Sequence, residues 1–158
     1  MAQVEELLRE TRQTLGIFES RLLLALAMQV RVERLVAHPE DEVTPEAESS
    51  FRDYAARRLA GEPYPYIVGE QEFYGRSFRV TPDVLIPRPD TELIVELALE
   101  ELKRFTSPTV LDMGTGSGCI AITVALENPK AEVWASDMSE AALEVARGNA
   151  GKSGVRFL

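Results

Sequence analysis

A glycine-rich turn between a short apolar strand and an apolar helix is the feature that most restricts what this chain can fold into. Residues 110–118 read Val-Leu-Asp-Met-Gly-Thr-Gly-Ser-Gly, with glycine at every second position of the turn. Residues 120–127 continue as an apolar helix, and residues 131–136 form a second apolar strand that Asp137 ends. The order of strand, helix and strand is typical of parallel pairing, so the sequence predicts an α/β fold.

The alternation continues towards the C-terminal end of the sequence. A further helix is predicted over residues 139–149, and residues 155–158 look like the start of a third strand. Half of a doubly wound sheet has no strands to cover the other side of its core. We therefore expect the sequence to be part of a longer protein.

The N-terminal segment, residues 1–62, has a helical pattern. Apolar residues recur at helical spacing near the N-terminus, and residues 21–36 are rich in Leu and Ala. Thr44 and Pro45 are typical of a helix start, because Thr caps the first turn and Pro fits the first helical position. This pattern predicts a small helical bundle.

Residues 63–84 are predicted to form a linker with a β-hairpin. Pro63, Pro65 and Gly69 punctuate the linker, and two short strands flank Gly75-Arg76. The remaining segment, residues 85–158, forms the α/β domain.

Two prolines stiffen the beginning of this α/β domain. Residues 85–92 read Leu-Ile-Pro-Arg-Pro-Asp-Thr-Glu, and we expect Asp90 or Thr91 to cap a helix. The apolar residues of that helix are Leu93, Ile94, Leu97, Ala98 and Leu102. The arginine of this segment, Arg88, has a planar guanidinium that suits a carboxylate such as Asp112 or Asp137.

Charge and cysteine content exclude several functions. The formal net charge of −9 leaves no broad electropositive surface, so we expect no direct nucleic-acid binding. The single cysteine, Cys119, has no partner for a disulfide or a zinc site, and it is expected to pack as a small apolar residue. No secretory signal or membrane-spanning run is present, so the sequence predicts a cytoplasmic protein without a metal.

The residues of the glycine turn limit which ligands it is able to bind. Glycine lets the main chain bend sharply and brings a ligand against bare backbone. The fingerprint of nicotinamide and flavin enzymes would require Gly or Ala at position 119, where this sequence has Cys119. That fingerprint also does not call for an acid such as Asp112 at the end of the strand.

Two carboxylates accompany the turn. Asp112 suits the ammonium group of an amino acid, either directly or through water. Asp137 ends the second strand at the same edge of the sheet and is able to accept both hydroxyls of a ribose. A ribose and a cationic amino acid without a phosphate describe S-adenosylmethionine. The predicted cofactor-binding residues are Asp112, Gly114, Thr115, Gly116, Ser117, Gly118 and Asp137.

The segments 85–92 and 111–118 together resemble the release factor glutamine N5-methyltransferases, the HemK family. The resemblance implies an N-terminal helical bundle that contacts the substrate, a β-hairpin linker and a truncated Rossmann-like class I methyltransferase domain. It also implies methylation of the glutamine side-chain amide in the Gly-Gly-Gln motif of class 1 peptide chain release factors, with Gly114 to Gly118 and Asp137 holding the cofactor.

The catalytic Asn-Pro-Pro-Tyr motif of that family does not occur in these 158 residues. No catalytic residue is therefore assigned, and we expect the 158 residues alone not to methylate. Two alternatives remain open on the residues themselves. One is a nicotinamide-dependent oxidoreductase, and the other is a non-catalytic protein-binding module in which the sheet is only a scaffold.

Overall fold

The computed structural model describes residues 2–155, which form two compact units divided between Val68 and Gly69. The sequence predicts a helical domain that ends at residue 62 and a separate linker and hairpin over residues 63–84. In the structure, residues 63–68 of the predicted linker belong to the first unit and the hairpin belongs to the second. Most of the expected third strand, residues 156–158, lies outside the described residues.

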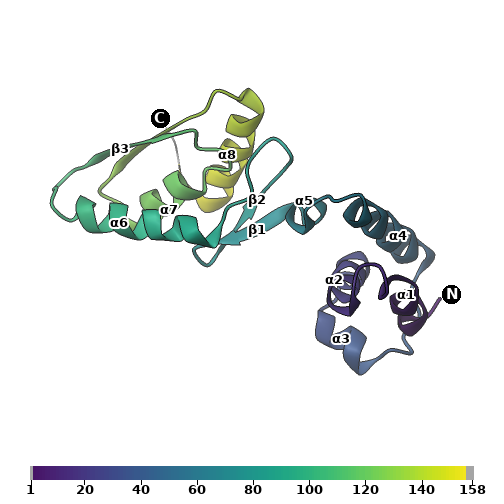
Figure 1. Ribbon diagram of the computed structural model, residues 1–158. Helices are drawn as coiled ribbons and strands as arrows, with labels where there is room; N and C mark the ends of the chain where they lie inside the picture. The colour runs from purple at the N-terminus through teal and green to yellow at the C-terminus, as the bar shows by residue number, and fades with distance from the viewer. Residues whose placement is uncertain (1, 156–158) are drawn as a thin grey trace. The chain divides into compact units, whose positions relative to one another are not determined.

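The first unit is helical, as the sequence predicts. Among the described residues it consists of α1 (Val4–Thr11), α2 (Ile17–Met28), α3 (Val32–Ala37), α4 (Pro45–Leu59) and α5 (Tyr64–Val68) (Figure 1). The largest fully buried side chains of its core are Phe51, Leu7, Leu23, Leu24, Val4 and Val43. No helix of the described chain combines the length and the apolar character needed to cross a membrane.

The run over residues 21–36 is two helices rather than one. Gln29 has a φ of 55° and caps the C-terminus of α2 in the left-handed conformation. A residue in this conformation turns the chain out of the helix. The helical prediction for this stretch therefore corresponds to two helices, and its Leu-rich part is buried at Leu23 and Leu24.

The start of α4 follows its local sequence. The N–H group of Ala47 donates to the Thr44 hydroxyl oxygen at 3.3 Å, and Pro45 occupies the first turn. Proline also lies inside the next element, because Pro65 is the second residue of the short helix α5. The first turn of a helix tolerates proline, so part of the predicted linker is helical.

The predicted hairpin is present. Strands β1 (Glu70–Phe73) and β2 (Arg76–Arg79) pair antiparallel, and the turn between them is Tyr74-Gly75, one residue earlier than predicted. Both turn residues have positive φ, 52° and 69°, which suits a tight two-residue hairpin. Phe73 and Phe78 are buried edge to face, with ring centroids 6.1 Å apart, so the hairpin packs into the second core.

The second unit contains the predicted alternation of strands and helices. It comprises the hairpin, the 3₁₀ turn η1 (Pro89–Thr91), α6 (Glu92–Leu102), β3 (Thr109–Met113), α7 (Cys119–Glu127), β4 (Glu132–Ser136) and α8 (Glu140–Ser153). Strands β3 and β4 pair in parallel from Thr109 opposite Glu132 to Met113 opposite Ser136. The α/β prediction is confirmed. The expected cap of α6 is not, because Thr91 makes no side-chain capping bond and the helix follows η1 directly.

One face of the β3–β4 pair is packed against helices, and the other face is exposed. Val133 is buried in the core together with residues of α7, and α7 packs against α6 (Figure 1). On the other face Leu111, Met113 and Trp134 are 59%, 77% and 42% exposed. Of the apolar residues of α6, Leu93, Ile94 and Leu97 are exposed as well. The helix buries Val95, and Leu102 packs against the core. Parallel sheets are usually covered on both faces, so this arrangement is unusual for the part of the chain described.

Gly118 should be difficult to replace. It has a φ of +80°, and an added Cβ would lie 3.0 Å from Cδ1 of Ile122 and 3.2 Å from Cβ of Ala146. We predict that Gly118→Ala lowers the free energy of unfolding by about 1–3 kcal/mol, measured by urea denaturation. The control is Gly148→Ala in α8, where an added Cβ meets nothing within 4 Å. This change should stabilise the helix by about 0.5–1 kcal/mol, and equal losses in both variants would contradict the prediction.

Candidate functional site

Parallel pairing brings the glycine turn and the end of β4 together. Beyond the last strand pair, the N–H groups of Gly114 and Thr115 both donate to the carbonyl oxygen of Ser136, at 2.8 and 2.9 Å. The turn is therefore anchored on the neighbouring strand before it reaches α7. As a result, the residue after Ser136 lies beside the turn.

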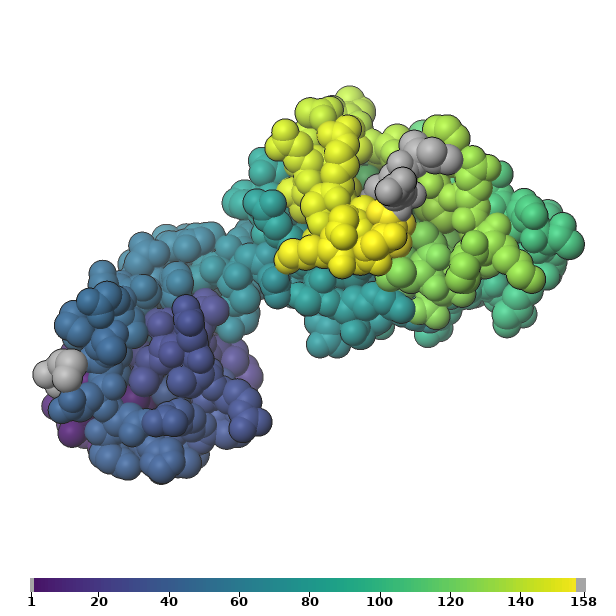
Figure 2. All heavy atoms as spheres, turned by 180° about the vertical axis from the view of Figure 1, so that it is seen from behind, coloured from purple at the N-terminus to yellow at the C-terminus, as the bar shows by residue number. Residues whose placement is uncertain are grey.

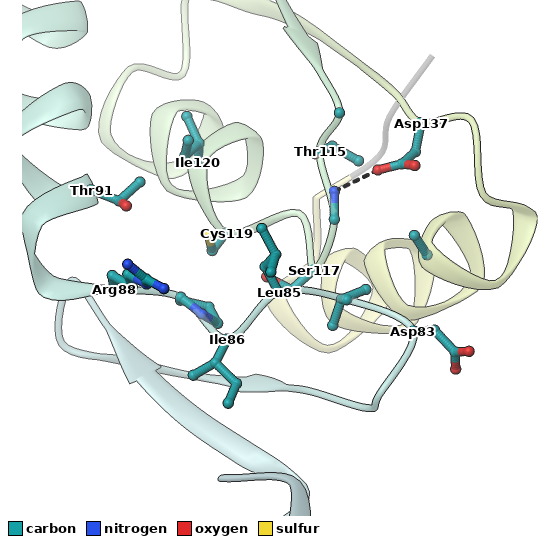
Figure 3. Close-up of a pocket in the computed structure, with 15 residues that line it drawn as sticks. Asp83, Leu85, Ile86, Arg88, Thr91, Thr115, Ser117, Cys119, Ile120 and Asp137 are labelled. Atoms are coloured by element: carbon teal, nitrogen blue, oxygen red, sulfur yellow. Dashed lines mark hydrogen bonds between the residues drawn. The ribbon is translucent and has the colours of Figure 1, made fainter. Parts of the chain in front are cut away.

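That residue is Asp137, and its carboxylate bridges two backbone segments. Oδ1 accepts the N–H of Ser139 at 2.9 Å. Oδ2 accepts the N–H of Gly116, also at 2.9 Å, which is the dashed bond in Figure 3. These N–H groups, that of Ser139 most strongly, hold the pKa of Asp137 below its usual value. The carboxylate is therefore ionised at neutral pH, and its bonds weaken only when the pH falls through that lowered pKa. Each carboxylate oxygen keeps acceptor capacity for a ligand.

The other acid, Asp112, supports the turn from the strand that precedes it. Its Oδ2 accepts the hydroxyl of Thr115 at 2.8 Å, and Thr115 is buried. Because this carboxylate is used within the turn, it fixes the position of the main chain.

Two glycines leave the main chain of the turn bare. Gly114 and Gly116 have φ values of +76° and +55°, which L side chains rarely adopt, and an added Cβ at either position would meet no atom within 4 Å. Open space therefore borders the backbone at both positions. A ligand is able to approach the main chain there more closely than side chains would allow.

A cavity of about 370 Å³ lies against the turn, within the size range of small-molecule sites. Five of the seven predicted residues line it, namely Gly114, Thr115, Gly116, Ser117 and Asp137. Asp112 and Gly118 are not among the lining residues. The opposite wall comes from the proline-rich segment and η1. Its residues are Asp83, Val84, Leu85, Ile86, Pro87, Arg88 and Thr91, and Cys119, Ile120 and Ala142 complete the lining.

Comparison with known proteins identifies both units. The chain matches the family model "PrmC N-terminal domain" over residues 1–69 and the family model "Methyltransferase small domain" over residues 91–157. It is 54% identical over 138 residues to "Release factor glutamine methyltransferase" of Bordetella pertussis, covering 87% of this chain and 51% of that protein. The protein of the same name from Burkholderia pseudomallei is 46% identical over 151 residues, covering 96% of this chain and 52% of that protein.

The chain belongs to the release factor glutamine methyltransferase family. It spans about half the length of the curated relatives it matches. The family assignment that residues 85–92 and the glycine turn suggest is therefore confirmed. In this family member both segments line one cavity, so the sequence motifs that indicate the family are also neighbours in space.

Asn149 also supports the turn in this family member, although no sequence motif marks it as a site residue. Its side chain is 2% exposed, and its Nδ2 donates to the carbonyls of Ser117 at 2.8 Å and Arg79 at 3.0 Å. Its Oδ1 accepts the N–H of Arg79 at 2.8 Å. The side-chain amide of Asn149 thus ties the glycine turn to the hairpin. In Figure 2 the yellow atoms of α8 lie against teal atoms, the colour of the hairpin region. The sequence does contain one signal for Asn149, namely a polar residue at a position that shares the buried face of α8. The other residues of that face are Ala142, Val145, Ala146 and Ala150.

Cys119 opens α7 and lines the cavity, and its surroundings favour the thiol over the reactive thiolate. Burial raises the pKa of its thiol, so the thiol is protonated at neutral pH. Its side chain is 8% exposed and belongs to the second core, as expected for a small apolar residue.

One group of possible metal ligands lies in the first unit. Donor atoms of His38, Glu40 and Asp41 fall within 4.8 Å of one another. His38 and Glu40 are exposed, and Asp41 already pairs with Arg34 at 2.8 Å. We assign no metal to this group.

Asn149→Leu should destabilise the second unit. The change keeps a similar volume but leaves the Ser117 carbonyl and both backbone groups of Arg79 without their partner, at a cost of about 2–4 kcal/mol in the free energy of unfolding. The matched control is Asn128→Leu, because the Asn128 side chain accepts the N–H of Lys130 at the surface, at 3.2 Å, and does not tie distant segments together. Urea denaturation should show a loss below about 1 kcal/mol for the control. Similar losses in the two variants would argue against the role of Asn149.

Proposed function

We propose that this chain contributes the helical domain and the cofactor-binding site of a protein-(glutamine-N5) methyltransferase. The donor is S-adenosylmethionine, and the acceptor is the glutamine side-chain amide in the Gly-Gly-Gln motif of a class 1 peptide chain release factor. The observation that supports the cofactor is that Asp137 and the bare main chain of Gly114 and Gly116 line the same cavity. The names of the curated relatives support the acceptor.

The residues fit this cofactor chemically. Asp137 keeps unused lone pairs for the two ribose hydroxyls, while its bonds to Gly116 and Ser139 hold it in place. The cofactor carries no phosphate that a carboxylate would repel. Asp112, which accepts the Thr115 hydroxyl, adds a negative charge that favours the cationic amino acid portion near Thr115. When bound, S-adenosylmethionine supplies a sulfonium-bound methyl group for the amide nitrogen.

The helical unit is proposed to contact the release factor, and the chain is proposed to have no direct contact with nucleic acid. A cytoplasmic location follows from this substrate, since release factors act on ribosomes. An amide nitrogen is a poor nucleophile and requires hydrogen-bond acceptors that align it with the methyl group. The residues assigned here hold the cofactor and do not supply those acceptors, so we propose that the 158 residues alone do not transfer the methyl group.

Asp137 provides the test of the cofactor site. Isothermal titration calorimetry should show that the chain binds S-adenosylhomocysteine at one site and does not bind NADH. Asp137→Ala should weaken the binding by at least about 10-fold, because charge-assisted hydrogen bonds are lost. The control is Asp83→Ala, since Asp83 lines the same cavity but is exposed and accepts the hydroxyl of Thr81 at 2.9 Å. NADH binding without S-adenosylhomocysteine binding would favour an oxidoreductase and contradict the proposal.

Binding to the release factor tests the proposed partner. Surface plasmon resonance should show that the chain binds a purified class 1 release factor, with an acidic protein of similar size as the negative control. Asp137→Ala should not alter this affinity, because the contact is assigned to the helical unit. Excess RNA should not compete, given the net charge of −9. Failure to bind any class 1 release factor would contradict the proposed substrate, and release factor binding without cofactor binding would favour a non-catalytic module.

A further inference from the structure

Arg88 is the cationic residue among those that line the cavity. The acidic residues of the lining are Asp83 and Asp137. The Arg88 side chain is exposed, and its guanidinium makes no ion pair or side-chain hydrogen bond within residues 2–155. Its charge and its five N–H donors are therefore available to a ligand in the cavity.

The carboxylates that the sequence offers as partners for Arg88 are used elsewhere. Asp112 accepts the Thr115 hydroxyl, and Asp137 accepts the N–H groups of Gly116 and Ser139. An ion pair of Arg88 with either acid, which the sequence allows, is not formed. The structural role considered for this arginine thus has no support in the geometry.

The backbone around Arg88 is held in one conformation. Pro87 is buried and Pro89 begins η1, and each proline fixes its own φ and restricts the residue before it. The carbonyl of Arg88 accepts the N–H of Thr91 at 3.0 Å, which closes the 3₁₀ turn. A guanidinium on such a segment loses less conformational freedom when it binds a ligand.

Arg88 and Asp137 lie at different ends of the cavity. Figure 3 shows Arg88 beside Thr91 on one side and Asp137 on the other, with Thr115, Ser117 and Cys119 between them. S-adenosylmethionine has a matching polarity, because its ribose hydroxyls and its amino acid carboxylate are at separate ends of the molecule. A ribose held by Asp137 leaves the amino acid portion to extend along the turn towards Arg88.

We propose that Arg88 binds the carboxylate of the amino acid portion of S-adenosylmethionine and so selects cofactors that carry this group. The assignment rests on the proposed function, because it assumes this cofactor in the cavity. A guanidinium and a carboxylate form two parallel hydrogen bonds, and a lysine at this position would replace them with a single point contact. The carboxylate would also be the one anion in the ligand that complements the one cation of the lining.

Two ligands that differ only in this group provide the test. Isothermal titration calorimetry is carried out on the full chain with S-adenosylmethionine and with decarboxylated S-adenosylmethionine. Arg88→Met should weaken binding of the first ligand by about 10- to 100-fold and leave binding of the second unchanged. The affinity of Arg88→Lys for S-adenosylmethionine should lie between the affinities of Arg88→Met and the unsubstituted chain. The matched control is Arg104→Met, because Arg104 is a surface residue of the same unit that pairs with Glu101 at 3.1 Å, and it should change neither affinity.

The outcomes separate this inference from the function on which it rests. A loss that is equal for both ligands would mean that Arg88 only maintains the structure, and it would overturn the assignment. Unchanged binding of both ligands to Arg88→Met would also overturn it, while the cofactor site itself would stand. If the unsubstituted chain binds neither ligand, the proposed function fails, and the assignment of Arg88 fails with it.

Discussion

The parallel pairing of β3 with β4 is the interaction on which the site depends. Its register, with Met113 opposite Ser136, continues past the strands because the Ser136 carbonyl accepts the next two N–H groups of the turn. Gly116 is thereby placed within 2.9 Å of the Asp137 carboxylate. A register shifted by one residue would reverse the faces of the strand and separate these groups. The shape of the cavity is therefore a consequence of strand pairing.

Side chains from three different elements then hold the turn in place. Asp112 from β3 bonds Thr115, Asp137 from the end of β4 bonds Gly116, and Asn149 from α8 bonds Ser117. Each contact fixes a different residue of a segment whose glycines would otherwise leave it free to move. A turn that is already fixed loses little conformational entropy when a ligand binds, which increases affinity for a given set of contacts.

Local signals explain which parts of this structure follow from the sequence. Strand β3 ends directly before the glycine turn, and α4 begins at Pro45 with Thr44 as its capping residue, as the sequence predicts. Each of these boundaries is marked by a local residue pattern. The interruption at Gln29 has no such mark, since glutamine is not typical of the left-handed conformation. The supporting role of Asn149 does not follow from the sequence, because its partners Arg79 and Ser117 are 70 and 32 residues away in the chain. The exposure of Trp134 likewise depends on which elements cover the sheet, and a helical or strand period does not contain that information.

The central claim is that the glycine turn and Asp137 together hold the ribose and amino acid portions of one cofactor. Amide resonances report this directly, because the N–H groups of Gly116 and Ser139 are both bonded to the Asp137 carboxylate. Titration of the ¹⁵N-labelled chain with S-adenosylhomocysteine, followed by two-dimensional NMR, should give its largest chemical-shift changes at Gly114, Gly116 and Ser139. Saturable changes confined to other parts of the chain, with these three amides unmoved, would contradict the claim.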